Sequence, residues 1–160
     1  MEPTFRYRVE AIADAPIEVV FATVTDHESY AEWTTCDESF LEVKGDSEAN
    51  GFGSVRVLRD RTSLKDGVID VKEVTNHYWP PYLHGYRVVD TSIVRDHQGI
   101  VLLERLGDGR TKAVWHMVAT PVDSAMAEVL RPQLAAGIEG LVNDLCAEAG
   151  RRHARAASST

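Results

Sequence analysis

Apolar and polar residues alternate over residues 5–13, which predicts a half-buried strand at the start of the chain. Pro16 follows and suits the first turn of a helix. Beyond it, apolar residues recur at the i, i+3, i+4, i+7 spacing of a short amphipathic helix, at Ile17, Val20, Phe21 and Val24. Asp26 is placed to cap a second short helix that carries Tyr30 and Trp33.

The pattern from residue 38 to residue 120 is typical of strands. Six are expected, at residues 38–43, 53–59, 67–75, 82–90, 99–106 and 110–120. Turn-forming residues separate them at 50–53, 65–67, 96–99 and 107–109. Pro80-Pro81 blocks ladder hydrogen bonds and marks a further break. The Asp108-Gly109 pair favours a tight hairpin, because glycine adopts positive φ at no steric cost.

A helical period replaces the strand pattern after Pro121. Asp123 or Ser124 can cap this helix. Its apolar stripe consists of Met126, Leu130, Leu134, Ile138, Leu141 and Leu145. Pro132 lies inside the stripe and removes one backbone donor, so a kink or break is expected near residues 128–131. Gly137, beside the stripe, leaves room for the close approach of either a strand or a bound molecule.

One long helix is thus available to cover seven antiparallel strands. A flat sheet would leave much of one face wet, whereas a strongly curved sheet buries that face and encloses a cavity. The expected fold class is α+β: a seven-stranded curved antiparallel sheet gripping a long C-terminal helix, with two short helices after the first strand and an internal cavity. The 160 residues suit one domain over residues 1–155, with residues 156–160 as a fraying tail.

Charge and composition narrow the classes of partner. The chain has 17 Lys and Arg residues against 25 Asp and Glu residues, a formal net charge of −8, which argues against a nucleic-acid partner. No apolar run reaches the roughly 18 residues of a membrane span. The N-terminus lacks the form of a signal peptide, and the only cysteines, Cys36 and Cys146, suggest idle thiols in a cytoplasmic setting. The six histidines form no metal-binding pair, so no metal is expected.

The opening helices resemble a known superfamily. Residues 15–21 read Ala-Pro-Ile-Glu-Val-Val-Phe and lead to Asp26 and then to Tyr30-Ala-Glu-Trp33. With Gly51-Phe-Gly53 entering a strand, Val-Lys-Glu-Val at 71–74 and Leu-Val-Asn-Asp-Leu at 141–145, the sequence resembles the START-related helix-grip (SRPBCC) proteins, and within them the polyketide cyclase/dehydrase and lipid-transport family. The resemblance spans essentially the whole chain. It implies the same fold and no cofactor, but the family holds both enzymes and carriers.

Candidate site residues lie on the strands. Tyr82, His84 and Tyr86 share one face of a strand by alternation, and the corresponding strand in relatives lines the cavity. Aromatic rings with polar tips suit a flat, partly oxygenated ligand. A register slip of one residue would turn the same side chains outward, and that alternative stays open.

Charged residues on apolar strands are the second group of candidates. An inward Arg56 would polarise a carbonyl or hold a carboxylate, and the resemblance to family cyclases favours this position, although a surface arginine fits equally well. Glu73 and Glu104 are either buried acid–base groups or salt-bridged structural residues. His116 is either a proton shuttle or a structural histidine.

Two functions remain from the sequence. The first is a cofactor-independent aromatase/cyclase or dehydratase in which Arg56, Tyr86, His84 and Glu104 are catalytic. The second is a non-catalytic carrier of a lipid, sterol or quinone. Either way the partner is a hydrophobic small molecule, and the chain acts as a monomer or homodimer. The expected ligand-binding residues are Tyr30, Trp33, Glu73, Tyr82, His116, Leu134, Gly137, Ile138 and Leu141. Several ionisable residues converging on one ring would favour catalysis, and one polar anchor in an apolar cavity would favour carriage.

Overall fold

The computed structural model describes residues 4–61, 67–91 and 94–159. One antiparallel sheet with the order β1-β7-β6-β5-β4-β3-β2 forms the body of the chain. Its strands are β1 (Phe5–Ala13), β2 (Glu38–Val43), β3 (Val55–Arg61), β4 (Val68–Trp79), β5 (Leu83–Val89), β6 (Val94–Arg105) and β7 (Thr111–Pro121). The helices are α1 (Ile17–Thr25), α2 (Tyr30–Trp33), the short 3-10 helix η1 (Ser124–Met126) and α3 (Ala127–Ser158).

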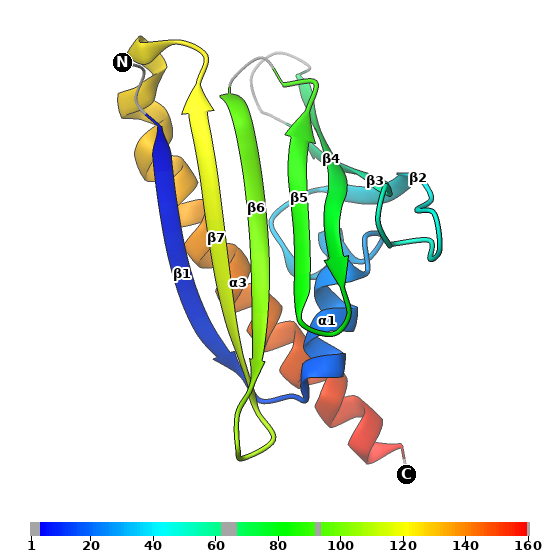
Figure 1. Cartoon of the computed structure of the whole chain (residues 1–160). Helices are drawn as coiled ribbons and strands as arrows, with labels where there is room; N and C mark the ends of the chain where they lie inside the picture. The colour runs from blue at the N-terminus through cyan, green and yellow to red at the C-terminus, as the bar shows by residue number, and fades with distance from the viewer. Residues whose placement is uncertain (1–3, 62–66, 92–93, 160) are drawn as a thin grey trace.

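The sheet curves around α3, which crosses its inner face obliquely toward α1 (Figure 1). α3 packs mainly on β1, β7 and α1. On β7, Trp115 and Met117 face the helix and meet Ile138 and Leu145, which are 2% and 0% exposed. This arrangement confirms the helix-grip architecture expected from the sequence. Among the described residues, no helix is long and apolar enough to cross a membrane.

The chain between β1 and β2 begins as expected and then departs from expectation at Asp26. β1 has the bounds that alternation gave it, and Pro16 is the N-cap of α1. Asp26, expected to cap α2, is instead the C-cap of α1, and Ser29 precedes α2. The Asp26 carboxylate accepts a hydrogen bond from Arg152 at 3.0 Å, so it ties α1 to the end of α3.

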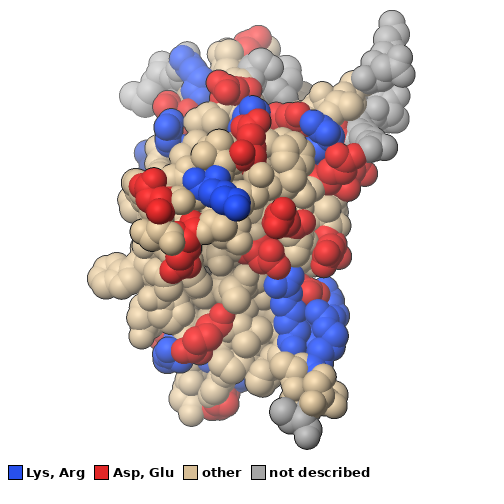
Figure 2. All heavy atoms as spheres, turned by 90° about the vertical axis from the view of Figure 1, so that its right-hand side faces the viewer, with Lys and Arg blue, Asp and Glu red and all other residues tan. Residues whose placement is uncertain are grey.

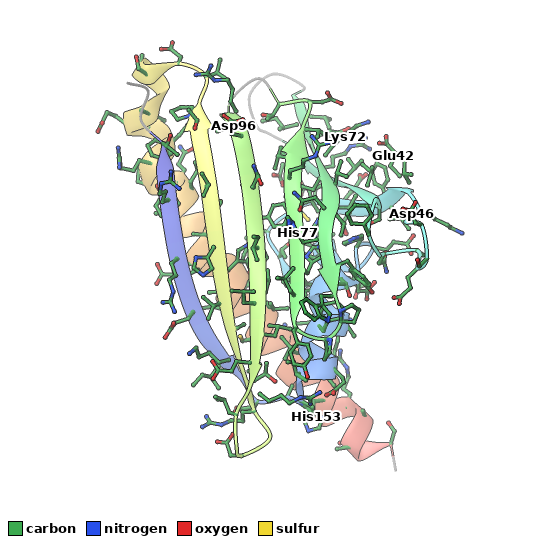
Figure 3. All side chains as sticks on the ribbon, viewed as in Figure 1. Glu42, Asp46, Lys72, His77, Asp96 and His153 are labelled. Atoms are coloured by element: carbon green, nitrogen blue, oxygen red, sulfur yellow. The ribbon has the colours of Figure 1, made fainter. Side chains whose placement is uncertain are left out.

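β6 is longer than expected because residues 96–99 lie within the strand, with a bulge at 96–97, and do not form a turn. The register between β6 and β7 shifts between Arg95 and Gln98. Asp96, labelled at the upper end of β6 in Figure 3, takes the left-handed φ of 52° that Asp tolerates better than most residues. The expected hairpin at 107–109 is confirmed, with Gly109 at a φ of 84°. Of the expected turn at 65–67, residues 65 and 66 lie outside the described part.

α3 continues through Pro132 without a break and reaches Ser158. The break that was one of the two alternatives expected near residues 128–131 is therefore wrong. The helix also extends past residue 155, where a fraying tail was expected to begin. The buried Glu148 carboxylate accepts hydrogen bonds from Arg151, Arg152 and Arg155, which fastens the last turns. At its other end Asp123 caps η1 by accepting from the Ala125 N–H at 2.9 Å.

Candidate functional site

A buried ion pair joins β3 and β4 on the inner face of the sheet. Arg56 and Glu73 are directly opposite each other in the antiparallel register. They are 2% and 6% exposed, and Arg56 Nε donates to Glu73 Oε2 at 2.6 Å. Burial opposes the charge on Arg56, but the Glu73 carboxylate raises the pKa of the guanidinium above its ordinary value. Arg56 therefore stays charged inside the protein.

Two tyrosines pack on the Arg56 guanidinium. Its central carbon lies 3.9 Å from the ring centroid of Tyr30 on α2 and 5.4 Å from that of Tyr86 on β5. Both tyrosines are almost fully buried, and burial raises the pKa of each hydroxyl above its ordinary value. At neutral pH both hydroxyls therefore keep their protons and can donate hydrogen bonds.

Polar atoms in this cluster are left with unused bonding capacity. Arg56 Nη1 and the Tyr30 hydroxyl are buried and find no hydrogen-bond partner of acceptable geometry among the described residues. Buried polar atoms without a partner are rare and costly in folded proteins. A donor on Arg56 and a hydroxyl on Tyr30 are thus available to an oxygen atom of a bound molecule.

A second buried network without charges lies beside the ion pair. His27 Nε2 lies 3.1 Å from Ser54 Oγ, which donates to Thr75 Oγ1 at 2.9 Å. Thr75 Oγ1 in turn lies 3.4 Å from His84 Nε2. The four side chains come from the segment after α1, the residue before β3, β4 and β5, and each is at most 2% exposed. Sequence reasoning missed His27, Ser54 and Thr75, because only the folded chain brings these separate segments together.

Both histidines of this network are held neutral. Burial, reinforced by the nearby Arg56 charge, lowers the pKa of His27 to about 3. The same causes, with His27 as a third, lower the pKa of His84 well below its ordinary value. His84 Nδ1 has no hydrogen-bond partner among the described residues. The neutral His84 imidazole lies next to Tyr86, and the centroids of the two rings are 6.2 Å apart. Depending on the tautomer, His84 Nδ1 either accepts or donates a hydrogen bond.

The Tyr86 ring occupies space that a glycine leaves open. Gly99 on β6 is the cross-strand partner of Tyr86, and a Cβ added at Gly99 would overlap the tyrosine ring. Trp115 Nε1 donates to the Tyr86 hydroxyl at 3.3 Å. The β6 bulge brings His97 to the same ring, with centroids 6.2 Å apart. These contacts hold Tyr86 in one orientation.

We expect Gly99→Ala to lower the free energy of unfolding by about 1–3 kcal/mol, because the new methyl group must displace the Tyr86 ring in a packed interior. Gly140→Ala is the matched control, since its added Cβ meets nothing within 4 Å and a helical alanine is favoured over glycine. Urea unfolding of both variants checks the prediction. Equal stability of Gly99→Ala and the wild-type chain would contradict it.

A hollow lies between the inner face of the sheet and α3, with a volume of about 190 Å³. Tyr30 and Cys36 line it from the α2 side, Leu58 and Val71 from β3 and β4, and Gly137 and Leu141 from α3. A second hollow of about 100 Å³ shares Gly137 and Leu141 with it. The cavity expected between sheet and helix is thus small and open to solvent. The space further in is filled by Arg56, Glu73 and Tyr86.

Several residues expected in the site do lie around this hollow and the cluster beneath it. Arg56, Glu73, His84 and Tyr86 form the buried cluster, and Tyr30 connects it to the hollow. Trp33 packs on Tyr30 with ring centroids 4.5 Å apart. On α3, Gly137 and Leu141 reach the hollow, whereas Ile138 is buried in the core and Leu134 is partly buried against it.

Three residues expected in the site, Glu104, His116 and Tyr82, lie outside it. Glu104 is exposed and pairs with Lys112 at 3.2 Å on the outer face, because the inner positions of β6 belong to Val101 and Leu103. His116 lies on the opposite face of β7 from the buried Trp115. Neither side chain points into the space between sheet and helix.

Tyr82 is also outside the cluster and is 46% exposed. It precedes β5, and its backbone N–H donates to the Trp79 carbonyl in the Pro80-Pro81 turn. The alternation that places His84 and Tyr86 inward therefore does not extend to Tyr82.

Metal ligands do not gather in the described part of the chain, where no three His, Cys, Asp or Glu side chains form a cluster. Cys36 and Cys146 are both free thiols. Burial raises the pKa of Cys146 to about 11 and raises that of Cys36 as well, so neither is an activated nucleophile. The chemistry that the site offers is the ion pair, the protonated tyrosines and the neutral histidines.

The fold is shared with solved structures of low sequence identity. The Zhui aromatase/cyclase from Streptomyces sp. R1128 superposes with a TM-score of 0.71 at 18% identity, covering 94% of this chain and 96% of that one. The di-domain aromatase/cyclase BexL of the BE-7585A biosynthetic pathway gives a TM-score of 0.71 at 17% identity, covering 94% of this chain and half of that one. A START superfamily protein from Mycobacterium smegmatis gives 0.63 at 14% identity, covering 88% and 98%. Among curated proteins, no sequence matches the chain.

These likenesses define the fold, an α+β helix-grip architecture. A family model described as polyketide cyclase/dehydrase and lipid transport matches residues 4–146. The chain therefore belongs to this family, as the opening motif and the last helix suggested.

Proposed function

We propose that the chain binds a hydrophobic, partly oxygenated small molecule between the sheet and α3 and acts on it as an aromatase/cyclase or dehydratase. The observation that carries this proposal is the buried Arg56–Glu73 pair, whose Nη1 donor is unused beneath the hollow. The family description and the aromatase/cyclase neighbours support it. A carrier needs one polar anchor, whereas this interior holds an ion pair, two tyrosines and two histidines.

The hollow can admit one end of such a molecule. Its volume of about 190 Å³ is below the roughly 300–1,000 Å³ of drug-sized ligand sites, so a larger ligand requires side-chain movement. Tyr30 is the residue that lines the hollow and also covers Arg56. A shift of its ring would join the hollow to the guanidinium. The Leu58, Val71 and Leu141 side chains would pack on the apolar body of the ligand.

Three residues of the buried cluster, Arg56, His84 and Tyr86, have roles in a cyclisation. Arg56 Nη1 donates to a ketone oxygen of the ligand and stabilises negative charge that develops there. The neutral His84 accepts a proton from the carbon between two ketones, and the resulting enolate carbon forms a bond to the polarised carbonyl carbon. Tyr86 donates a proton to the new alkoxide and recovers it from the imidazolium of His84. In the dehydration, His84 accepts the remaining proton of the same carbon, a carbon–carbon double bond forms, and the hydroxyl leaves as water with a proton from Tyr86, which recovers it from His84. The step needs no oxidant or cofactor.

We expect Tyr86→Phe to reduce product formation about 10²–10⁴-fold, the usual contribution of a positioned proton donor. The phenylalanine ring keeps the packing against Gly99, so the fold should be retained. Tyr82→Phe makes the same chemical change at a 46% exposed position and is expected to leave the rate unchanged. The measurement is aromatic product formed from a short poly-β-ketone thioester, followed by absorbance and mass spectrometry.

Two outcomes would contradict the catalytic proposal. The first is an equal rate for Tyr86→Phe and Tyr82→Phe, which would remove the hydroxyl from the mechanism. The second is a wild-type chain that binds the thioester and releases it unchanged. Tight binding without turnover would favour the alternative function, carriage of a lipid, sterol or quinone.

A further inference from the structure

A hollow larger than the one between the sheet and α3 lies elsewhere on the molecule. A cleft of about 600 Å³ opens between α1, the loop joining β2 to β3, the Pro80-Pro81 turn and the end of α3. We call it the α1 cleft. Its volume falls within the usual range for small-molecule sites. No residue of the α1 cleft lines the hollow near Gly137, so the two are separate places on the molecule.

One wall of the α1 cleft is aromatic and apolar. Phe21 of α1 and Tyr78 of β4 pack with ring centroids 5.4 Å apart, and Pro80 and Pro81 continue this wall. Flat, rigid surfaces of this kind favour a flat ring or a compact apolar body. Ala22 and Ala49, which also line the cleft, keep its mouth free of large side chains.

The rim of the α1 cleft carries negative charge that the protein only partly compensates. Glu18 pairs with Arg105 and Asp26 with Arg152. Glu48 has no cationic partner among the described residues and only accepts a hydrogen bond from the Tyr78 hydroxyl at 2.6 Å. Figure 2 shows acidic side chains spread over the face that carries this loop, with basic side chains gathered toward the C-terminus. Glu48 is therefore the acidic residue of the cleft whose charge no basic side chain of the described residues neutralises.

The same loop carries a second acceptor, on Asn50. Asn50 Oδ1 is buried and has no hydrogen-bond partner among the described residues, although it belongs to a residue that lines the cleft. The loop that presents both acceptors is fixed by backbone hydrogen bonds, from Gly45 N–H to the Ala49 carbonyl at 3.0 Å and from Gly51 N–H to the Glu48 carbonyl at 2.9 Å. A preorganised pair of acceptors lowers the entropic cost of binding a donor.

We propose that the α1 cleft is a binding site for a small aromatic primary amine. The ammonium group would donate to the Glu48 carboxylate and, once the Asn50 amide turns toward the cleft, to Asn50 Oδ1, since it has three N–H donors and no acceptor. The ring would pack on the wall of Phe21, Tyr78 and the two prolines. This site is independent of the cyclase proposal, because it uses none of the residues of the buried cluster.

The test is titration of the ¹⁵N-labelled chain with tyramine and, separately, with 4-ethylphenol, which keeps the ring but lacks the amine. We expect tyramine to shift the backbone amide signals of Ala22, Ala49 and Asn50 in a saturable way, and 4-ethylphenol to bind at least about tenfold more weakly. The signals of Gly137 and Leu141 should stay in place. Equal affinity of the two probes, or shifts confined to Gly137 and Leu141, would overturn the proposal.

Two matched variants sharpen the result. Glu48→Gln removes the carboxylate charge and is expected to weaken tyramine binding about tenfold. Asp46→Asn removes a charge from the same loop at an exposed position outside the cleft, labelled in Figure 3, and is expected to leave the affinity unchanged. The same loss of affinity in both variants would show attraction to net charge alone and would overturn the site.

Discussion

Replacing Glu73 with leucine is expected to lower the free energy of unfolding by about 3–5 kcal/mol, the usual cost of removing one partner of a buried ion pair. The change leaves the Arg56 guanidinium charged, 2% exposed and without its carboxylate. Its neighbours, Tyr30 and Tyr86, offer ring faces and hydroxyl groups but no negative charge at neutral pH. Since a domain is stabilised by about 5–15 kcal/mol in total, the loss is a large fraction of the stability.

The double variant Arg56→Met/Glu73→Leu shows what the two charges contribute to stability, because apolar side chains then fill the same buried space. Apolar residues of similar volume in place of both ions are expected to return the stability close to that of the wild-type chain or above it. A double variant at least as stable as the wild-type chain would therefore mean that the pair is kept for the chemistry of the site at the expense of stability. Additive losses in the double variant would contradict this interpretation.

A control for the ion pair exists on the same two strands. Arg59 and Asp70 are also cross-strand partners on β3 and β4, and Arg59 Nε donates to Asp70 Oδ1 at 2.8 Å. Both side chains are about one-third exposed, so water screens their attraction. Asp70→Asn should cost far less than Glu73→Leu in urea unfolding. Similar losses in both variants would show that burial does not set the strength of the Arg56–Glu73 pair.

The architecture of this chain was predictable because its elements carry strong periodic signals. Alternation gave β1 its bounds, and the four-residue stripe located α3. The β6 bulge was not predictable, because an Asp-His-Gln-Gly sequence suits a turn as well as a left-handed residue within a strand. The end of α3 was also predicted wrongly, because the composition of the last residues suggested a fraying tail. In the structure, Glu148 forms ion pairs with three arginines of the following turns, and these pairs stabilise the end of the helix.

The residues of the candidate site were likewise predictable only where they interrupt a regular pattern. Arg56 and Glu73 stood out because charges on apolar strands break the local pattern, which is where functional residues are expected. Glu104 broke the pattern as well, but it lies on the outer face beside Lys112. Deciding between the two faces needs the strand register, which a shift of one residue reverses. His27 gave no signal, since its partners Ser54 and Thr75 are 27 and 48 residues away in the chain.

The second large effect that we expect is a loss of stability as the pH falls from about 6.5 to 4.5. Burial, followed by the Arg56 charge, lowers the pKa values of both His27 and His84 in the folded chain. In the unfolded chain each would take up a proton near pH 6.5. The unfolded state therefore binds more protons in this window, and stability rises with pH. Each histidine contributes up to about 1.4 kcal/mol per pH unit.

The variant His27→Gln/His84→Gln tests the origin of this slope. A glutamine can place a polar atom near the position of imidazole Nε2, so hydrogen bonds to Ser54 and Thr75 can persist, but it takes up no proton in this range. We expect the free energy of unfolding, measured by urea at pH 4.5, 5.5 and 6.5, to depend much less on pH than in the wild-type chain. The dependence should fall by up to about 1.4 kcal/mol per pH unit for each histidine removed.

His153→Gln removes a histidine that is exposed on α3, near the C-terminus (Figure 3). This control should keep the full slope of the wild-type chain. If the slope survives in His27→Gln/His84→Gln, the two imidazoles accept protons in the folded state. The neutral His84 that the cyclisation requires as a base would then be a cation at the lower end of this range, and the acid–base assignment would have to move to another residue of the cluster.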